Sequence, residues 1–254
     1  MSGILGVNVA STSYAEVVAK AVEWAKTRQS RTVVFANVHV IMEAFDNPKL
    51  RNSLNAADLV NPDGVPLVWA LKLLGNKQAS RVYGPDCTLA MLEAAASNGI
   101  PVGFYGGSPD VLDKLSTEVR ERYPEITISI LISPPFRETT AEEDADFVQQ
   151  ITDSGTGILF IGLGCPKQEL WMMSHAGRIP AVMFAVGAAF DFIAGTKAQA
   201  PRWMMRSGTE WLFRLSTEPK RLYRRYAKQN PRFVWYFACQ LASQRRQKSL
   251  DLSI

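Results

Sequence analysis

The order of apolar and amphipathic segments limits this chain to a small number of architectures. Short runs rich in β-branched and aromatic residues, such as Thr32–Ala36, Val102–Tyr105 and Ala181–Val186, alternate with segments in which apolar residues recur at helical spacing. Parallel strands need a crossover connection, usually a helix, so this alternation indicates a mainly parallel sheet with helices on both faces. The predicted fold class is therefore α/β, and a mostly helical, basic segment follows the last strand.

The expected elements occupy nearly all of the 254 residues, enough for one large domain with an appendage. Strands are predicted at Ile4–Val9, Thr32–Ala36, Asp58–Asn61, Val102–Tyr105, Ile126–Leu131, Gly157–Ile161 and Ala181–Val186. Helices are predicted at Tyr14–Thr27, between residue 37 and about Ala56, and at Val65–Leu74, Asp86–Ser97, Pro109–Arg122, Ala141–Thr152 and Pro166–His175. These spans predict a core domain at residues 1–197 and a basic, aromatic helical appendage at residues 198–254.

Charge is distributed unevenly between these two parts. From Pro201 onward there are 12 Lys/Arg against 3 Asp/Glu, whereas the preceding residues hold 16 against 21. A basic segment of this kind favours phosphate groups, whether of lipid, nucleotide or nucleic acid. No recognisable nucleic-acid-binding module accompanies the charge, so nucleic acid is not a predicted partner. Interleaved aromatic residues, such as Trp203, Trp211, Tyr223 and Trp235, fit an amphipathic helix on an anionic membrane surface.

Cysteine usage and hydropathy indicate a cytoplasmic protein. Cys87, Cys165 and Cys239 are odd in number and lack metal-ligand spacing, which favours reduced thiols. The first residues have no basic start followed by an apolar stretch, so no secretory signal is expected. The apolar run Phe233–Ala242 is shorter than the about 20 residues that a membrane-spanning helix needs. The chain is therefore expected to lie on a membrane rather than to cross it.

Polar residues and glycines follow nearly every predicted strand. In open α/β sheets, ligands bind beyond the carboxyl ends of the strands. The residues at those positions are Asn37 and His39, Asp63 and Gly64, Gly106–Ser108, Gly164–Gln168 and Gly187–Asp191. Turn chemistry accounts for some of them, but it rarely produces such residues at every strand. This edge of the sheet is therefore the predicted ligand site.

Two glycine-containing junctions between a strand and a helix are candidate nucleotide contacts. Gly106 and Gly107 precede a serine that predicts a capped helix, whose free N–H groups favour an anion. An ordinary helix start is the alternative. The junction at Gly164 resembles half of a dinucleotide fingerprint, but Lys167 replaces the third glycine and no acidic residue lies about 20 positions further on. An NAD-dependent oxidoreductase is therefore the weaker hypothesis. Lys167 and Gln168 either hold a nucleotide or sugar or are merely solvated.

Several carboxylates have both a chemical and a structural interpretation. Asp63, at a strand end, is placed to act as a general base for an attacking hydroxyl, or it simply forms a turn. Arg81 and Asp86 are candidate substrate contacts, or they form a loop ion pair. Asp144 and Asp146 match an Asp-x-Asp metal motif, but they lie in an acidic first helical turn, where carboxylates complement the helix dipole. No metal site and no cofactor are predicted.

The basic segment supplies cations that can replace a metal. Arg214, Arg221, Arg224 and Arg225 fall at helical spacings. Guanidinium groups pair bidentately with phosphate oxygens and keep their charge at neutral pH. They are therefore expected to stabilise the charge on a departing diphosphate. Contact of the same segment with anionic lipid is a competing interpretation, and one segment can do both.

Seven motifs follow one another in a specific order and spacing from about Leu5 to about Phe237. They are Asn37-Val-His39, Asn61-Pro-Asp63-Gly64, Arg81-Val-Tyr-Gly84-Pro-Asp86, Phe104-Tyr-Gly106-Gly107, Gly162-Leu-Gly164-Cys-Pro166-Lys-Gln168-Glu169, Gly187-Ala-Ala-Phe190-Asp191-Phe and Glu210-Trp-Leu-Phe-Arg214-Leu. Together they resemble the WecG/TagA/CpsF family of bacterial glycosyltransferases. The resemblance implies a Rossmann-like core with a C-terminal appendage that closes over the active site and brings the enzyme to the inner face of the cytoplasmic membrane.

The resemblance also implies an activity and a set of site residues. The activity is an inverting, metal-independent transfer from a UDP-sugar donor to an undecaprenyl-diphosphate-linked sugar acceptor in cell-surface polysaccharide synthesis. Asp63 would be the general base. With the strand-end residues above, the expected substrate-binding set is Asn37, His39, Arg81, Asp86, Gly106, Gly107, Gly164, Lys167, Gln168 and Asp191. The expected diphosphate ligands are Arg214, Arg221 and Arg224.

The chain departs from the family pattern at one position that bears on the donor. Many members have a threonine two residues before the asparagine of the first motif, where this chain has Phe35. A donor contact through that hydroxyl is absent, which argues against N-acetylmannosamine as the donor. Members of the family use several donors, including N-acetylmannosamine, its uronic acid and glucose. A non-catalytic, membrane-associated nucleotide-binding protein is the alternative to an enzyme. The oligomeric state is left open, with a homo-oligomer among the options.

Overall fold

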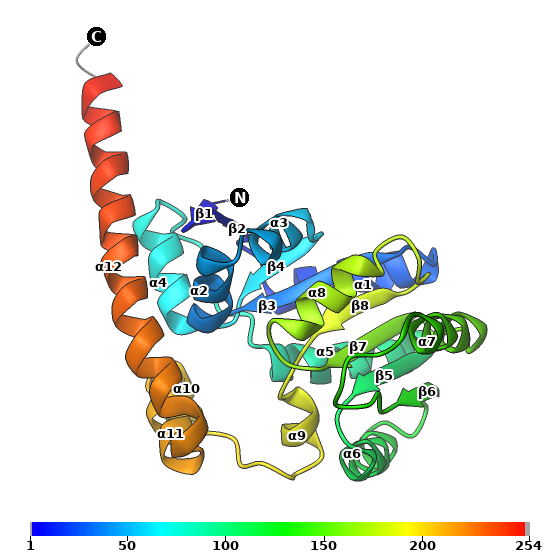
Figure 1. Ribbon diagram of the computed structural model, residues 1–254. Helices are drawn as coiled ribbons and strands as arrows, with labels where there is room; N and C mark the ends of the chain where they lie inside the picture. Colours follow the sequence, from blue (N-terminus) through cyan, green and yellow to red (C-terminus); the bar gives the residue numbers. More distant parts are fainter. Residues whose placement is uncertain (1, 252–254) are drawn as a thin grey trace.

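A single six-stranded sheet forms the centre of the computed structural model, which describes residues 2–251 (Figure 1). Met1 and residues 252–254, which the predicted domains include, lie outside the described residues. All neighbouring strands are parallel. Their order is β4 (Leu59–Pro62), β3 (Arg31–Ala36), β8 (Val182–Ala185), β7 (Ile158–Gly162), β5 (Val102–Gly106) and β6 (Ile128–Ile132). The predicted α/β class with a mainly parallel sheet is confirmed.

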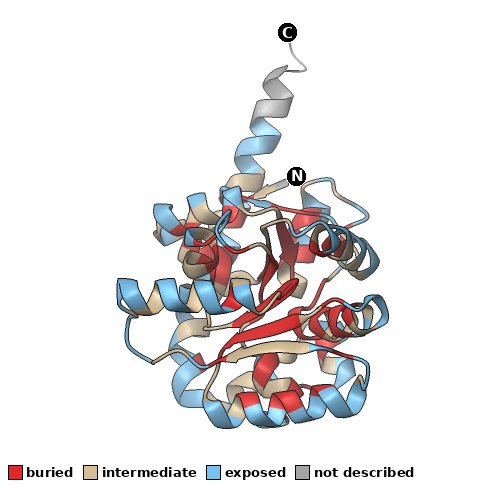
Figure 2. Ribbon diagram, turned by 90° about the vertical axis from the view of Figure 1, so that its right-hand side faces the viewer, coloured by how far each residue is buried: buried red, intermediate tan, exposed pale blue. Residues whose placement is uncertain are grey.

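Both faces of the sheet are buried because successive side chains of a strand point to opposite sides. In β3, Val33 and Phe35 belong to one apolar cluster, while Val34 and Ala36 belong to the other. The first cluster contains side chains from α1 (Tyr14–Lys26), α5 (Gly84–Asn98), α6 (Pro109–Arg122) and α9 (Ala189–Ile193). The second contains side chains from α2 (Val38–Asp46), α3 (Pro48–Ala56), α4 (Val65–Leu73), α7 (Ala141–Asp153) and α8 (Lys167–Ser174). Figure 2 shows most of the strands buried and the outer helix faces exposed, while the edge strand β6 is largely half-buried.

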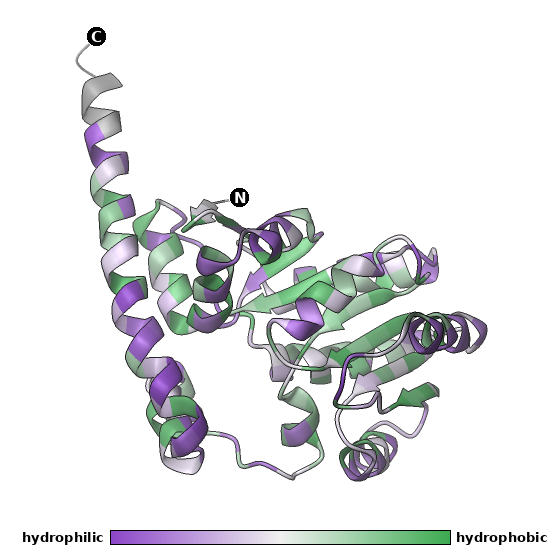
Figure 3. Cartoon of the chain, viewed as in Figure 1, coloured by the Kyte–Doolittle hydropathy of each residue, from purple (hydrophilic) through white to green (hydrophobic). Residues whose placement is uncertain are grey.

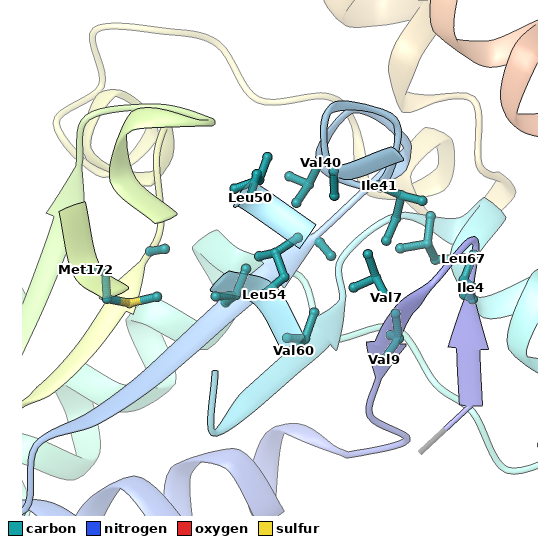
Figure 4. Close-up of a cluster of buried hydrophobic side chains, with 14 of the residues drawn as sticks. Ile4, Val7, Val9, Val40, Ile41, Leu50, Leu54, Val60, Leu67 and Met172 are labelled. Carbon is teal, nitrogen blue, oxygen red and sulfur yellow. The ribbon is translucent and has the colours of Figure 1, made fainter. Parts of the chain in front are cut away.

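The prediction of one continuous first strand is wrong. Ile4–Val9 was expected to be continuous, but β1 (Ser2–Ile4) and β2 (Val7–Val9) form an antiparallel hairpin apart from the main sheet. Leu5 (φ 48°) and Gly6 (φ 85°) reverse the chain between them. Two positive φ angles suit a tight hairpin turn, but leucine is an unusual residue for it, so the turn had a weak signal. The hairpin side chains still join the core, as the close-up of their cluster shows (Figure 4).

Three helices form the C-terminal part of the chain: α10 (Arg202–Ser207), α11 (Glu210–Thr217) and α12 (Pro219–Asp251). The long helix α12 packs on α2, where Tyr236 lies 4.6 Å from Phe45 between ring centroids and Arg232 forms a bidentate pair with Asp46. Its far end extends beyond the body of the molecule (Figure 1). Hydrophilic residues are frequent on α11 and the first half of α12 (Figure 3). Among the described residues, none of the helices combines the length and apolar character required to cross a bilayer.

Candidate active site

Asn37 and Asp63 lie beside each other because the strands that precede them are neighbours. Strands β3 and β4 run in parallel, so their carboxyl ends meet at one edge. The Asp63 N–H continues the ladder by donating to Ala36 O at 2.8 Å, and Asn37 caps α2 by accepting from Val40 N. A Cβ atom at Gly64 would lie 3.4 Å from Asn37, at ordinary contact distance, so the two loops lie close together.

A cavity of about 280 Å³ opens at this edge, between the core and the C-terminal helices. This volume is near the lower end for small-molecule sites. The core supplies four of the residues predicted to act on substrate, namely Asn37, His39, Asp63 and Arg81. Helices α11 and α12 supply a second wall of polar residues, comprising Glu210, Arg214, Arg225, Tyr226, Gln229 and Asn230. The site is therefore completed by residues far apart in the sequence.

Asp63 has the environment of a general base. Its Oδ1 accepts a hydrogen bond from the Gly84 N–H at 2.9 Å, at the start of α5. Burial raises the pKa of Asp63 to about 6, the Arg81 charge acts to lower it, and the Glu210 charge acts to raise it further. A carboxylate with this pKa is mostly ionised at pH 7 yet more basic than an ordinary aspartate. This combination suits proton abstraction near neutral pH.

Arg81 is held by protein oxygens on all three of its nitrogens. Its Nε donates to the main-chain oxygen of Asp63, and its Nη1 donates to Met205 O at 3.1 Å. Its Nη2 lies 2.6 Å from Glu210 Oε2. The guanidinium group also stacks on Tyr83, with its carbon 4.3 Å from the ring centroid. Arg81 therefore joins the Asp63 loop to α10 and α11.

His39 is a neutral hydrogen-bonding group in this cavity. Gln229 Nε2 donates to Glu43 at 2.7 Å, so Gln229 Oε1 faces His39 Nδ1 as an acceptor at 2.8 Å. His39 Nδ1 must then carry the proton, which leaves Nε2 as an acceptor. Burial, followed by the charge of Arg225, lowers the pKa of His39, so the ring is neutral at pH 7.

The predicted diphosphate ligands divide into two groups. Arg214 lines the cavity, and so does Arg225, which was noted in the sequence among the basic residues but not selected. Arg221 is exposed and pairs with Glu218 at 2.7 Å. Arg224 is exposed and does not line the cavity. The helical phase of α12 determines which arginines line the cavity, because Arg225 and Gln229 are one turn apart on the face that packs against α2.

The other predicted substrate residues lie outside this cavity, and most have protein partners. Asp86 pairs with Arg202 at 2.6 Å, and Asp191 pairs with Lys197 at 2.9 Å. Gln168 is buried, accepting from Gly164 N and donating to Glu169. The remaining residues lie at the ends of β5 and β7, namely Gly106, Gly107, Gly164 and the exposed Lys167.

Gly106 has a structural reason to be glycine. Its φ is 118°, and a Cβ there would lie 2.6 Å from the carbonyl carbon of Gly162 on the neighbouring strand. The Gly106–Gly107 pair is a predicted nucleotide contact, where a glycine would let a ligand approach the backbone. The close approach at Gly106 is instead made by another strand of the sheet.

The Asp-x-Asp pair is not arranged as a metal site in the part of the chain that is described. Asp144 accepts from His175 Nε2 at 2.9 Å and from Trp171 Nε1 at 3.2 Å, which links α7 to α8. No group of three or more His, Cys, Asp or Glu residues within the described residues could hold a metal ion. Asp144 therefore joins two helices.

Glu210, Arg225 and Gln229 line the cavity, but none of them was among the substrate or diphosphate ligands selected from the sequence. All three lie in the C-terminal helices. Glu210 and Gln229 bind partners more than 100 residues away in the sequence, and Arg225 lines the cavity beside them. A usable signal was present, since Arg225, Gln229 and Phe233 recur every four residues along one helical face. Choosing that face over its neighbour required the packing of α12.

A carboxylate and several guanidinium groups share one cavity at the carboxyl edge of a parallel sheet, an arrangement that suits a phosphate-containing substrate. Comparison with known proteins agrees. The model of the glycosyl transferase WecG/TagA/CpsF family matches residues 3–247, so the chain belongs to this family and is a glycosyltransferase. A similar relative is the N-acetylglucosaminyldiphosphoundecaprenol N-acetyl-beta-D-mannosaminyltransferase of Bacillus spizizenii, 30% identical over 190 residues, covering 74% of this chain and 72% of the relative. Family membership decides against the oxidoreductase hypothesis.

Proposed function

We propose that this protein is an inverting, metal-independent glycosyltransferase that moves a sugar from a UDP-sugar to an undecaprenyl-diphosphate-linked saccharide. The observation that carries the proposal is a basic carboxylate, Asp63, in the same cavity as Arg214 and Arg225. The name of the Bacillus spizizenii relative supports the acceptor, because that enzyme acts on a sugar linked to diphosphoundecaprenol. The product then enters a cell-surface polysaccharide.

The diphosphate of the donor binds the guanidinium groups of the C-terminal helices. Burial and the neighbouring Arg221 charge lower the pKa of Arg225, as expected for a cation that lacks a counter-ion. Among the described residues, Arg225 has no carboxylate within ion-pair distance. A diphosphate would supply that missing negative charge and accept charge-assisted hydrogen bonds. Arg221 and Arg224, at the exposed side, add to the positive potential that attracts the donor.

Chemistry begins with proton transfer from the acceptor hydroxyl to Asp63. The resulting oxygen attacks the anomeric carbon on the side opposite UDP, so the configuration inverts. Negative charge grows on the departing diphosphate, where Arg214 and Arg225 stabilise it in place of a metal. Asn37 and His39 lie in the same cavity and position the sugars through hydrogen bonds. The nucleoside extends along the carboxyl edge toward Gly106, Gly164 and Asp191.

Selectivity for the donor sugar depends on the position that Phe35 occupies. This side chain is 6% exposed, stacks on Phe184, and would touch a Cβ at Gly84 at 3.4 Å. It therefore fills the space under the start of α5 with apolar surface instead of offering a hydroxyl. The relative's name indicates N-acetylmannosamine, and we retain its uronic acid and glucose as further candidates.

The C-terminal helices bring the enzyme to the inner face of the cytoplasmic membrane. Large apolar side chains are exposed on them, among them Trp203 (67%), Tyr223 (65%) and Trp235 (68%). Lysine and arginine surround these residues, as in helices that rest on anionic lipid. The acceptor is itself a lipid, so membrane contact and acceptor delivery use the same surface.

The test measures UDP release from a panel of UDP-sugars offered with a short-chain diphospholipid-linked acceptor. We expect one donor to support turnover, and we expect EDTA to leave the rate unchanged. Asp63→Asn should lose about 10²–10⁴-fold in kcat while UDP still binds, because general-base assistance has that size. No transfer with any donor, or a strict divalent requirement, would overturn the proposal. UDP binding without transfer would instead support the non-catalytic alternative.

A further inference from the structure

Glu210 is an acidic residue in a wall whose other charged members are Arg214 and Arg225. It lies in the first turn of α11, its side chain is 14% exposed, and its Oε2 is 2.6 Å from Arg81 Nη2. Its other oxygen lies 3.9 Å from Arg214 Nε. A part-buried carboxylate beside a proposed diphosphate site works against anion binding unless it has another task. Its position between two guanidinium groups indicates that task.

Glu210 determines which carboxylate Arg81 pairs with. The Arg81 side chain reaches the Asp63 main-chain oxygen, Met205 O and Glu210 Oε2. The Asp63 carboxylate, on the same loop, accepts only the Gly84 N–H among the described residues. Arg81 is thus close to Asp63 but does not bridge its carboxylate. Removing Glu210 would leave Asp63, whose charge already acts on Arg81, as the carboxylate available to pair with the guanidinium group.

We propose that Glu210 is a positioning residue for the base: when the C-terminal helices dock, its carboxylate holds the Arg81 guanidinium and keeps one oxygen of Asp63 free for the acceptor hydroxyl. The inference rests on the proposed role of Asp63 and adds a function to the appendage. Docking of the appendage completes the diphosphate site and also activates the base. When the appendage is undocked, Asp63 therefore pairs with Arg81 and does not act as a base.

The charges around Asp63 give the proposal a measurable consequence. Arg81 and Tyr83 face it from the segment before α5, Gly84 N–H from the start of α5, and Tyr14 from α1. Helix α11 contributes Glu210 and Arg214. Glu210 is the anion in this set at neutral pH. Without it, the two cations dominate and the pKa of Asp63 moves down toward its ordinary range.

The experiment compares pH profiles of kcat for the wild type, Glu210→Gln and Glu210→Asp in the full chain. In Glu210→Gln, pairing of Arg81 with Asp63 should move the acid limb down by on the order of one pH unit. The plateau kcat should fall by at least about tenfold, a part of what a general base contributes. Glu210→Asp keeps the charge and should keep the wild-type acid limb. UDP binding should persist in both variants.

Asp46→Asn is the matched control, since it also removes a carboxylate that pairs with an arginine of the C-terminal helices but does not face Asp63. The Phe45–Tyr236 and His39–Gln229 contacts still hold α12 on α2 in this variant, so its acid limb should coincide with that of the wild type. A wild-type profile in Glu210→Gln, or an equal shift in Glu210→Asp or Asp46→Asn, would overturn the positioning role. Asp63→Asn separates the two proposals: full activity there removes the base itself, whereas an inactive Asp63→Asn with an unchanged Glu210→Gln removes only the inference about Glu210.

Discussion

Replacing Asp63 by asparagine should stabilise the fold while it slows transfer. The pKa of Asp63 rises from 3.8 to about 6 on folding, mainly through burial. A shift of about two pKa units corresponds to about 3 kcal/mol of folding stability, which is lost when the Asp63 carboxyl ionises. The asparagine side chain carries no charge, and its amide oxygen can still accept from the Gly84 N–H. We therefore expect Asp63→Asn to gain about 1–3 kcal/mol of unfolding free energy at pH 7, the lower values allowing for a weakened interaction with Arg81.

The pH dependence identifies the cause of this gain. Because the folded pKa of Asp63 is raised, the folded state binds more protons than the unfolded state between pH 3.8 and about 6. Wild-type stability should therefore fall, from this group, as pH rises through that window. The variant lacks the term, so its advantage should be small near pH 4 and largest above pH 6. Urea unfolding followed by far-UV circular dichroism at pH 4, 5, 6 and 7 measures it.

The control for this prediction is again Asp46→Asn. Hydrogen bonds from Arg232 lower the pKa of Asp46, which is largely exposed, so its removal should cost a little stability rather than add any. Destabilisation of Asp63→Asn at pH 7, or a gain equal at pH 4 and pH 7, would refute the reasoning. Either result would mean that burial does not penalise the ionised carboxylate in this cavity.

Two further predictions concern the sheet edge and the cations. Gly106→Ala should lower the free energy of unfolding, measured in urea, by more than about 4 kcal/mol, because its Cβ would lie 2.6 Å from the backbone of Gly162. Gly107→Ala has its nearest contact at 3.5 Å and should lose roughly 1–2 kcal/mol. Equal losses in the two variants would contradict this prediction. Arg214→Ala should lower kcat/KM by about 10–100-fold and Arg224→Ala far less, since only Arg214 lines the cavity. A larger effect of Arg224→Ala in UDP-release kinetics would show that α12 turns another face to the substrate.

Short-range patterns explain why much of the core was predictable. The strand containing Phe35 was found because a run of apolar residues, buried on both faces, reads the same in any α/β protein. The strand ends followed from it, and with them Asn37, His39 and Asp63, which do meet at one cavity. The hairpin around Leu5–Gly6 was not predicted, because its turn lacks the usual residues and depends on packing of its flanking valines.

The long-range pairs could not be read from the sequence. Arg81 and Glu210 are 129 residues apart, and each alone has several possible partners. The pairing of Asp144 with His175 is of the same kind, and it turned a metal motif into a contact between two helices. Such choices depend on which surfaces pack together, and local propensity carries no information on that.

Periodicity and strand-end residues act over a few residues at a time, so the amino-acid order was enough to predict a parallel α/β domain with a ligand site at the carboxyl edge of its sheet. Which side of α12 faces that edge depends on packing, and packing places Arg225 with Arg214 in the cavity while Arg224 stays exposed. The tertiary structure also decided that Arg81 is held by Glu210. The first outcome depends on the packing of α12 against α2 and the second on the position of α11, and both involve contacts between residues far apart in the chain.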